Sequence, residues 1–278
     1  MTDAFVARDA SELPDAVMAD AFSPLDSPMP DAFAALDAFT PDAFVLPDAP
    51  VSPCGDLRLY FRFENASGML LDESGCENHG TPVNVLFGQP SPRGLAYQFA
   101  RAGVTNATVQ VPDSASLSGL SQLTVESWVM QSVRGYSYLA SHGDGLDGDP
   151  FALGTSTGGE PMIAIPNSPT CTGVNNPNAP VGIPVDVWTH IAVTLEIASR
   201  EVVFFINGLE VYRAASSIAL GPLCDNPEPL VIGALRTSGT LGFEGFIDEL
   251  RIWSVVRTQA EVCTDAGGVP GLEGSCAL

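Results

Sequence analysis

Short segments in which apolar and polar residues alternate, separated by turn residues, occupy this chain from residue 56 onward. The first of them, Asp56–Phe63, alternates strictly, so its leucine and phenylalanine side chains share one face of a strand. Further segments with strand patterns are Ala96–Phe99, Ala107–Val111, Leu123–Met130, Tyr138–Ser141, Met162–Ile165, Trp188–Leu195, Val202–Ile206, Leu209–Ala214, Leu230–Gly233 and Phe243–Trp253. Because many short strands occur with almost no helical pattern, the sequence predicts an all-β fold built as an antiparallel sandwich.

Two local signals add a turn and a helix to this pattern. Asn207 and Gly208 separate two strand segments and supply the two residues of positive φ that a type I′ hairpin turn requires. Near the end of the chain, Thr258 and Glu261 have the spacing of a capping box, in which their side chains cap the first turn of a helix. The sequence therefore predicts one tight hairpin and one short C-terminal helix.

The first 53 residues differ in composition from the rest. Asp-Ala-Phe recurs there with irregular spacing, starting at Asp3, Asp20, Asp31, Asp37 and Asp42. Ten acidic residues against one arginine keep the segment extended, and its prolines interrupt helices. Because too little apolar surface is present for a core, we expect residues 1–53 to be a disordered, acidic, Pro/Ala/Asp-rich tether and residues 54–278 to be the folded domain. The interleaved phenylalanines could instead be short partner-binding motifs.

The charge of the chain limits its partners. The sequence has 33 acidic residues and 11 basic ones, all of them arginine, for a net charge of −22. This charge repels phosphate backbones and anionic lipid, so we expect no nucleic-acid binding. No run of about 18 apolar residues occurs, so we also expect no membrane insertion. The N-terminus lacks the basic start and apolar core of a signal peptide, and we expect any leader to have been removed or replaced in this sequence.

Five motifs in a fixed order carry a family resemblance. They are Leu59–Glu64 with Leu71–Thr81, Val111–Leu117 with Leu123–Val129, Trp188–Val193, Phe205–Leu209 and Gly245–Trp253. Together they resemble the laminin-G-like domains of the concanavalin A-like lectin/glucanase superfamily, although Cys76 stands where the usual pattern has asparagine. The resemblance covers nearly all of residues 56–262 and implies a two-sheet jelly roll with neighbouring first and last strands. It also implies ligand binding at loop rims or on a sheet face, often of glycans and often with Ca²⁺, but it does not fix the ligand.

One carboxylate in this pattern points to a metal. Strand alternation puts Asp248 on the apolar face of Phe246–Ile252, where a charge is costly unless a metal or several donors satisfy it. The resemblance implies a structural Ca²⁺ held by this aspartate and the entry loop, with Asp72 and the backbone of Asn78 and Gly80 as its other ligands. The alternative is that Asp248 accepts hydrogen bonds from loop amides with no ion.

Six cysteines all lie after residue 53, and an even number in a loop-rich β-protein favours disulfides and an oxidising compartment over zinc. No C-x₂-C spacing supports a zinc site. The pairing we favour is Cys54 with Cys76, Cys171 with Cys224, and Cys263 with Cys276. A competing arrangement joins Cys54 to Cys263, since the resemblance implies that the first and last strands are adjacent.

Nothing in the sequence supports catalysis strongly. Retaining glucanases of this superfamily carry Glu-x-Asp-x-x-Glu on one strand, and that string does not occur here. The nearest candidate for one of the paired carboxylates of a glycosidase, Glu126, stands alone. Trp128, Trp188 and Trp253 could stack on a sugar, but in this pattern we expect them to lie in the core. We therefore expect no enzyme.

The hypothesis that fits these observations is a non-catalytic extracellular or cell-surface adhesion module on a flexible tether, binding a glycan or a surface protein. Two alternatives stay open. The chain could be a degenerate or unrecognised glycoside hydrolase, or a purely structural envelope protein without a small ligand. The identity of the ligand and the oligomeric state are not determined by the sequence.

Overall fold

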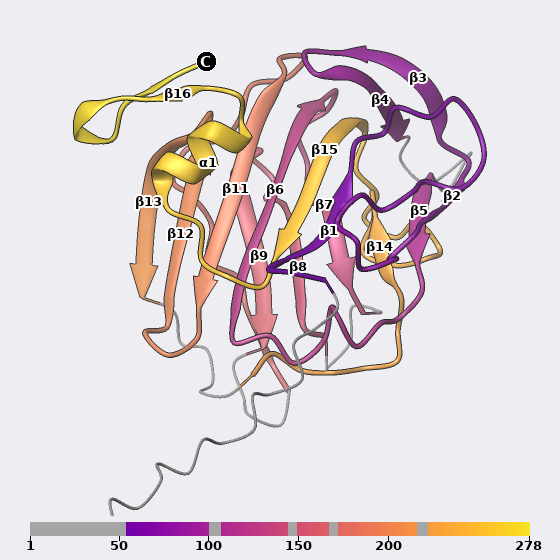
Figure 1. Cartoon of the computed structure of the whole chain (residues 1–278), viewed down its shortest axis with the longest axis horizontal. Coiled ribbons are helices and arrows are strands. Elements are labelled where there is room, and N and C mark those ends of the chain that lie inside the picture. Colours follow the sequence, from indigo (N-terminus) through magenta and orange to yellow (C-terminus); the bar gives the residue numbers. More distant parts are fainter. Residues whose placement is uncertain (1–53, 100–106, 144–148, 167–171, 216–221) are drawn as a thin grey trace, which may run out of the picture. The chain divides into compact units, whose positions relative to one another are not determined.

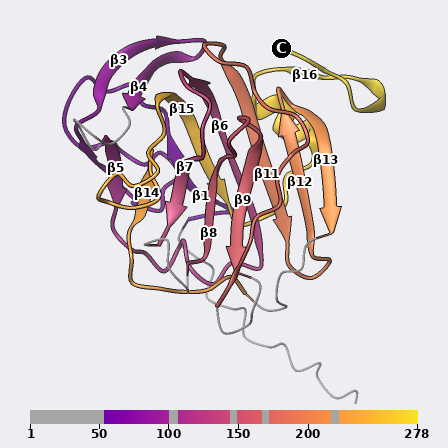
Figure 2. The same ribbon diagram turned by 180° about the vertical axis from the view of Figure 1, so that it is seen from behind.

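Two antiparallel sheets are stacked face to face (Figures 1 and 2). The structure, a computed structural model, describes residues 54–99, 107–143, 149–166, 172–215 and 222–278. The larger sheet has the order β13 (Leu209–Ala215), β12 (Glu201–Ile206), β11 (Thr189–Glu196), β6 (Gln122–Gln131), β15 (Gly245–Trp253), β4 (Gly94–Phe99) and β3 (Leu86–Ser91), and β1 (Leu57–Phe61) also pairs with β15. The smaller sheet has the order β10 (Val174–Asn175), β9 (Pro161–Pro166), β8 (Phe151–Thr155), β7 (Ser137–His142), β14 (Leu230–Ile232), β5 (Thr108–Val111) and β2 (Thr81–Val83). The predicted all-β, two-sheet sandwich is confirmed.

Four strands of the two sheets were not evident from the sequence: β2, β3, β8 and β10. Strand β10 has only two residues. All five residues of β8 are buried, so β8 has no alternation to reveal it. Strand β3 contains a glycine and a proline, residues that normally interrupt a strand, and β2 has only three residues. The local sequence pattern did not reveal these strands, because pairing with neighbouring strands defines them rather than the intrinsic propensity of their residues.

Alternation along the central strands fills the space between the sheets. In β6, Leu123, Val125 and Val129 have no exposed surface and belong to the main hydrophobic cluster. The residues between them, such as Glu126 and Trp128, point to the other face of the larger sheet, which is called the outer face below. That outer face carries most of the polar and charged groups discussed in the next section.

The first and last strands of the sandwich are neighbours, as the resemblance implied. Strand β1 pairs with the second half of β15, from Leu250 to Trp253, and β4 pairs with its first half, from Gly245 to Ile247. A β-bulge lies where the partner changes, and Glu249 there has a φ of 52°.

The bulge overturns one expectation about Asp248. Regular alternation would place this carboxylate on the face of Leu250 and Ile252. In the structure Ile247, Leu250 and Ile252 face the core, and Asp248 shares the outer face with Phe246. The extra residue at Glu249 shifts the alternation by one position, and a sequence pattern cannot show such a shift.

The two local signals are confirmed. Asn207 and Gly208 have φ values of 51° and 74° in the turn between β12 and β13. Helix α1 (Gln259–Asp265) begins with the capping box of Thr258 and Glu261. It lies over the outer face of the larger sheet (Figure 1), where its Val262 packs on residues of β11 and β12. A 3₁₀ turn (Leu272–Gly274) and two short paired strands, β16 (Val269–Pro270) and β17 (Cys276–Ala277), follow the helix.

The described residues all belong to one compact unit, Asp48–Leu278. The predicted tether, residues 1–53, lies outside the described part of the chain. Within the described part, no helix combines the length and the apolar character needed to cross a membrane.

Candidate functional site

The carboxylate of Asp72, the first predicted calcium ligand, accepts hydrogen bonds from backbone amides and a hydroxyl group of nearby residues. Its Oδ1 accepts hydrogen bonds from the amides of Tyr60 (2.8 Å) and Ser74 (2.9 Å). Its Oδ2 accepts from the Ser74 hydroxyl (2.7 Å) and the Asn78 amide (3.0 Å). Because the Glu73 amide also donates to the Tyr60 carbonyl, the entry loop covers the free edge of strand β1.

The other two predicted entry-loop ligands also have structural partners. The Asn78 side chain is buried and donates to the Arg58 carbonyl (2.7 Å) and the Ser116 hydroxyl (2.8 Å). Gly80 exchanges two backbone hydrogen bonds with Leu70, both 2.8 Å. A side chain at Gly80 would collide with Val109, so this glycine permits close packing of the loop on the sandwich.

Asp248 has no exposed surface and has its own donors. Its Oδ1 accepts from the Glu249 amide (2.8 Å), and its Oδ2 accepts a short hydrogen bond from the Ser91 hydroxyl of β3. Burial raises the pKa of this carboxyl group to about 7.

The hydrogen-bond donors of Asp248 and Asp72 differ entirely. Among the described residues, no group of three or more His, Cys, Asp or Glu side chains is arranged to hold a metal ion. Calcium binding by Asp72 and Asp248 stays a prediction, and its test is given in the Discussion.

Two of the favoured disulfides are present. Cys54 is bonded to Cys76, and Cys263 is bonded to Cys276. The first joins the start of β1 to the entry loop, and the second closes the tail after α1. Cys224 is also disulfide-bonded. Its expected partner, Cys171, lies outside the described residues.

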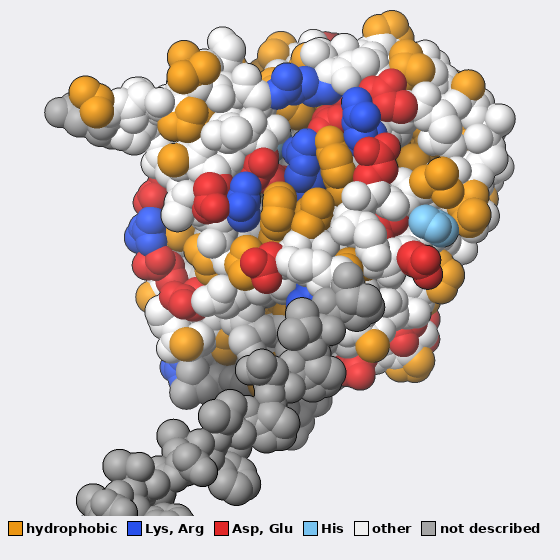
Figure 3. Space-filling model, viewed as in Figure 1, with side chains coloured by type: hydrophobic (Ala, Val, Ile, Leu, Met, Phe, Trp, Pro, Cys, Tyr) orange, Lys and Arg blue, Asp and Glu red, His pale blue; other side chains and the backbone are white. Residues whose placement is uncertain are grey.

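A polar cleft of about 380 Å³ opens on the outer face of the larger sheet, between β1, β15 and the end of α1. This outer-face cleft is lined by Tyr60, Arg62, Glu73, Arg93, Glu249, Arg251, Thr264 and Asp265. Figure 3 shows arginine and acidic side chains intermingled on this face. Six of the eight lining residues carry opposite charges in equal numbers, so the cleft is rich in donors and acceptors but balanced in formal charge.

The inner wall of the cleft is a tightly connected set of side chains. The Tyr60 hydroxyl donates to Glu249 (2.6 Å) and accepts from Arg251 (2.9 Å), and Arg251 also forms an ion pair with Glu249. The Arg251 guanidinium lies 4.3 Å from the centre of the Tyr60 ring. Burial and the neighbouring Glu249 raise the pKa of Tyr60 to about 12, so its hydroxyl stays protonated.

The outer wall is more exposed and less constrained. Arg62 lies 3.6 Å from Glu249 and 3.9 Å from Glu73, and Arg62 and Glu73 are about half exposed. Arg93, in the turn between β3 and β4, is exposed and packs against Gly267, just after α1. Its guanidinium forms no ion pair or hydrogen bond with any described residue. Arg93 can therefore turn toward a ligand in the cleft without breaking an existing pair.

None of these cleft residues was singled out from the sequence. One signal was available in the first strand segment. Tyr60 and Arg62 alternate with its buried residues, so the pattern places both on the face that points away from the core. A second signal was Arg251, on the outer face of β15. Strand alternation identified these positions as outward-facing, but only the pairing of β1 with β15 brings them together.

Glu126, the nearest catalytic candidate, lies beneath α1 with no exposed surface. One of its oxygens accepts from the Trp253 indole (2.9 Å), and the other lies 3.6 Å from His190. Burial, reinforced by the nearby Asp265 carboxylate, raises the pKa of Glu126 to about 8. Burial, with the charge of Arg251, lowers the pKa of His190 to about 3. Both groups are therefore neutral at pH 7, and no substrate can reach Glu126 in this structure.

Of the three tryptophans expected in the core, Trp128 is buried, whereas Trp188 and Trp253 are half-buried, and none belongs to the main cluster between the sheets. Trp128 is buried on the outer face against His190, with ring centres 5.8 Å apart. Trp188 and Phe246 are both half-buried and contact each other at 6.1 Å. Trp253 is covered by Arg257, 4.1 Å from its ring centre. The outer face therefore presents partly accessible aromatic surface as well as charges.

Comparison with known families matches this architecture. The sequence profile described as the concanavalin A-like lectin/glucanases superfamily matches residues 103–263, more than half of the chain. The chain belongs to this superfamily. No curated protein matches the sequence.

Several solved structures share the fold. One is the binding domain of Paraclostridial Mosquitocidal Protein 1, with a TM-score of 0.59 and 14% identity over 74% of this chain and 51% of that one. A second is domain 4 of a GH43 extracellular arabinanase from Geobacillus stearothermophilus in complex with arabinotriose, with a TM-score of 0.57, 20% identity, and coverage of 76% and 98%.

A botulinum neurotoxin type C structure, whose title concerns cell entry through two ganglioside molecules, has a TM-score of 0.56 and 9% identity over 76% of this chain and 51% of that one. The chain thus spans about half the length of the toxin structures and nearly all of the arabinanase domain. At these identities the likeness establishes the fold alone.

Proposed function

We propose that this chain is a non-catalytic binding module that recognises a glycan at its outer-face cleft. The observation that carries the proposal is the cleft itself, where three guanidinium groups and three carboxylates line one opening of about 380 Å³. Each sugar hydroxyl is both a donor and an acceptor, so a wall with both kinds of group matches a row of hydroxyls. The rigid pair of Tyr60 and Arg251 would fix the ligand's orientation, and the uncommitted Arg93 would close over it.

The known structures with this fold support a binding role. The arabinanase domain is described in complex with arabinotriose, and the mosquitocidal-protein structure is described as a binding domain. The two described disulfides support an extracellular or cell-surface location, because such bonds persist in oxidising compartments. In this proposal, residues 1–53 tether the module to the surface.

A glycan array probed with the full chain tests the proposal, followed by titration calorimetry with the best-retained glycan. Arg93→Gln and Glu73→Gln remove one donor and one acceptor from the exposed wall of the cleft. Each should weaken binding by about tenfold or more, the usual effect of a lost charged hydrogen bond. Arg213→Gln and Glu210→Gln are matched controls, because this exposed pair lies on β13 at the other edge of the sheet and should not affect binding.

Two other outcomes would point elsewhere. Release of reducing sugar from a retained glycan would favour the glycoside hydrolase. The burial of two carboxyl groups argues against the hydrolase. Glu126 and Asp248 have raised pKa values, but neither has any exposed surface that a substrate could contact. Retention of no glycan would overturn the glycan site and favour a protein ligand or a structural role.

A further inference from the structure

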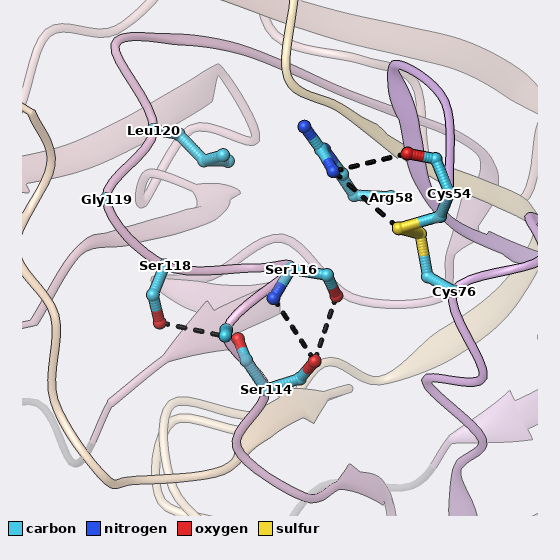
Figure 4. Close-up of a pocket in the computed structure, with 9 residues that line it drawn as sticks. Cys54, Arg58, Cys76, Ser114, Ser116, Ser118, Gly119 and Leu120 are labelled. Atoms are coloured by element: carbon cyan, nitrogen blue, oxygen red, sulfur yellow. Dashed lines mark hydrogen bonds between the residues drawn. A yellow bond between two sulfur atoms is a disulfide. The ribbon is translucent and has the colours of Figure 1, made fainter. Parts of the chain in front are cut away.

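A second cavity, here called the Arg58 pocket, has a volume of about 440 Å³ and shares no lining residue with the outer-face cleft. The Cys54–Cys76 disulfide and Arg58 form one side, and the loop 114–120 forms the other (Figure 4). The volume falls within the range of small-molecule sites and suits a ligand of about monosaccharide size.

Arg58 is the unusual element of this pocket. It is half-buried, yet it has no carboxylate partner among the described residues, although the chain has three acidic residues for each arginine. By contrast, the partly buried Arg251 and Arg257 both form ion pairs. The Arg58 guanidinium makes only long contacts, from Nη1 to the Cys54 carbonyl (3.4 Å) and sulfur (3.6 Å). Its Nε is buried and has no hydrogen-bond partner among the described residues.

A half-buried guanidinium that has no carboxylate partner among the described residues favours an anionic ligand, because partial burial removes some of the water that would otherwise solvate its charge. A carboxylate satisfies such a group best, since the planar fork of arginine matches the two oxygens in geometry and charge. None of the described residues that line the pocket is acidic.

The opposite side of the pocket offers hydroxyl groups. Ser114, Ser116 and Ser118 all line the cavity, and the oxygens of Ser114 and Ser116 lie 2.9 Å apart. The Asn78 side chain donates to Ser116 and fixes its position from behind. Each hydroxyl can donate to one acceptor and accept from others, so these serines suit a hydroxylated ligand. The apolar Leu120 completes the lining.

We propose that the Arg58 pocket binds a small sugar acid, with the ligand's carboxylate on Arg58 and its hydroxyl groups on the serines of loop 114–120. The disulfide keeps Arg58 facing the loop, because it fixes the start of β1 against the entry loop. This site is independent of the proposed glycan site, since the two cavities have no lining residue in common.

Titration calorimetry of the full, oxidised chain with D-glucuronate and D-glucose tests the proposal, because the two sugars differ by one carboxylate. Glucuronate should bind, and glucose should bind at least about tenfold more weakly. Arg58→Gln removes the charge and should weaken glucuronate binding by about tenfold to a hundredfold. Ala115→Trp keeps Arg58 but fills the exposed rim of the pocket, and should also abolish binding.

Arg213→Gln, on β13 and outside both cavities, serves as the control and should bind glucuronate like the unmodified chain. A melting curve of each variant separates loss of the site from loss of the fold. Equal binding of the two sugars, no binding of glucuronate, or full binding by folded Arg58→Gln would overturn the proposal. None of these results bears on the outer-face cleft, which is tested by its own variants.

Discussion

The carboxylate of Asp72 accepts a hydrogen bond from the backbone amide of Tyr60 at 2.8 Å, so a loop side chain occupies the place of a neighbouring strand. Strand β1 pairs with β15 on one side only, and its other edge would otherwise expose unpaired amides. The entry loop provides hydrogen-bond partners for that edge. It thereby holds Tyr60 in the cleft and Arg58 in its pocket. One buried aspartate thereby supports both proposed sites.

Replacing Asp72 by alanine should destabilise the fold strongly. The substitution removes four hydrogen bonds to a carboxylate and leaves three backbone amides, those of Tyr60, Ser74 and Asn78, without this acceptor. We expect a loss of about 2–4 kcal/mol in the free energy of unfolding, measured in urea. Asp56→Ala, at an exposed position, is the control. An equal, small effect of both substitutions would contradict this role of Asp72.

Glu126 should make stability depend on pH. Its pKa is about 8 in the folded state and about 4.3 when unfolded, so the folded state holds the proton across this interval. Stability should therefore fall as pH rises from about 4.3 to 8 and should level off above pH 8. Glu126→Gln cannot ionise and can still accept from Trp253, so its free energy of unfolding should fall less over this interval. Urea titrations between pH 5 and pH 9 measure the difference.

His190 should change the pH dependence of stability in the opposite direction to Glu126, because burial lowers its pKa. Its pKa is about 3 when folded and about 6.5 when unfolded, so the unfolded state takes up the proton first. Stability should therefore be lost as pH falls below about 6.5. His190→Gln should reduce this loss at acid pH, whereas Glu126→Gln should not. A pH profile unchanged in both variants would mean that neither group is buried in solution.

Besides a crosslinked fragment that contains Cys224, peptide mapping without reduction should recover one containing Cys54 and Cys76 and one containing Cys263 and Cys276. Removing the second bond by serine substitution should lower stability by about 3 kcal/mol, because it closes a loop of 13 residues in the unfolded chain. A fragment joining Cys54 to Cys263 would contradict the structure. Six free thiols would remove the argument for an extracellular location.

A chain that begins at Pro53 should melt at the same temperature as the full chain. Residues 1–53 have little periodic apolar surface and no cysteine to connect them to the domain. Differential scanning calorimetry of the two chains measures the comparison. A drop of several degrees on truncation would show that this segment packs on the domain, and the boundary at residue 54 would be wrong.

The calcium prediction is tested by melting in added Ca²⁺ and in chelator. An ion shared by Asp72 and Asp248 should stabilise the folded state by about 2.7 kcal/mol at a hundredfold excess over Kd. Asp248→Asn should then abolish the response. Melting that is identical in Ca²⁺ and chelator would identify both groups as hydrogen-bonded structural carboxylates, and the calcium site would be withdrawn.

Much of the fold was predictable because it follows from local patterns. The strand Asp56–Phe63 was evident from its alternation, the hairpin from Asn207 and Gly208, and the helix start from the spacing of Thr258 and Glu261. The proposed sites were not predictable in this way. Arg58 and Ser116 are far apart in sequence and each is unremarkable alone, and they face one cavity only because the loop 114–120 packs beside strand β1.

By itself, the sequence determined which residues of the regular strands such as β1 and β6 face the core, where the chain turns and which family it resembles, because side-chain periodicity and turn chemistry are local properties. Only the tertiary structure decided the chemistry of the surface. The bulge at Glu249 moved Asp248 to the outer face, and the pairing of β1 with β15 assembled a charged cleft from Tyr60 and Arg251. Register and bulges depend on contacts between distant strands, and no local pattern encodes them.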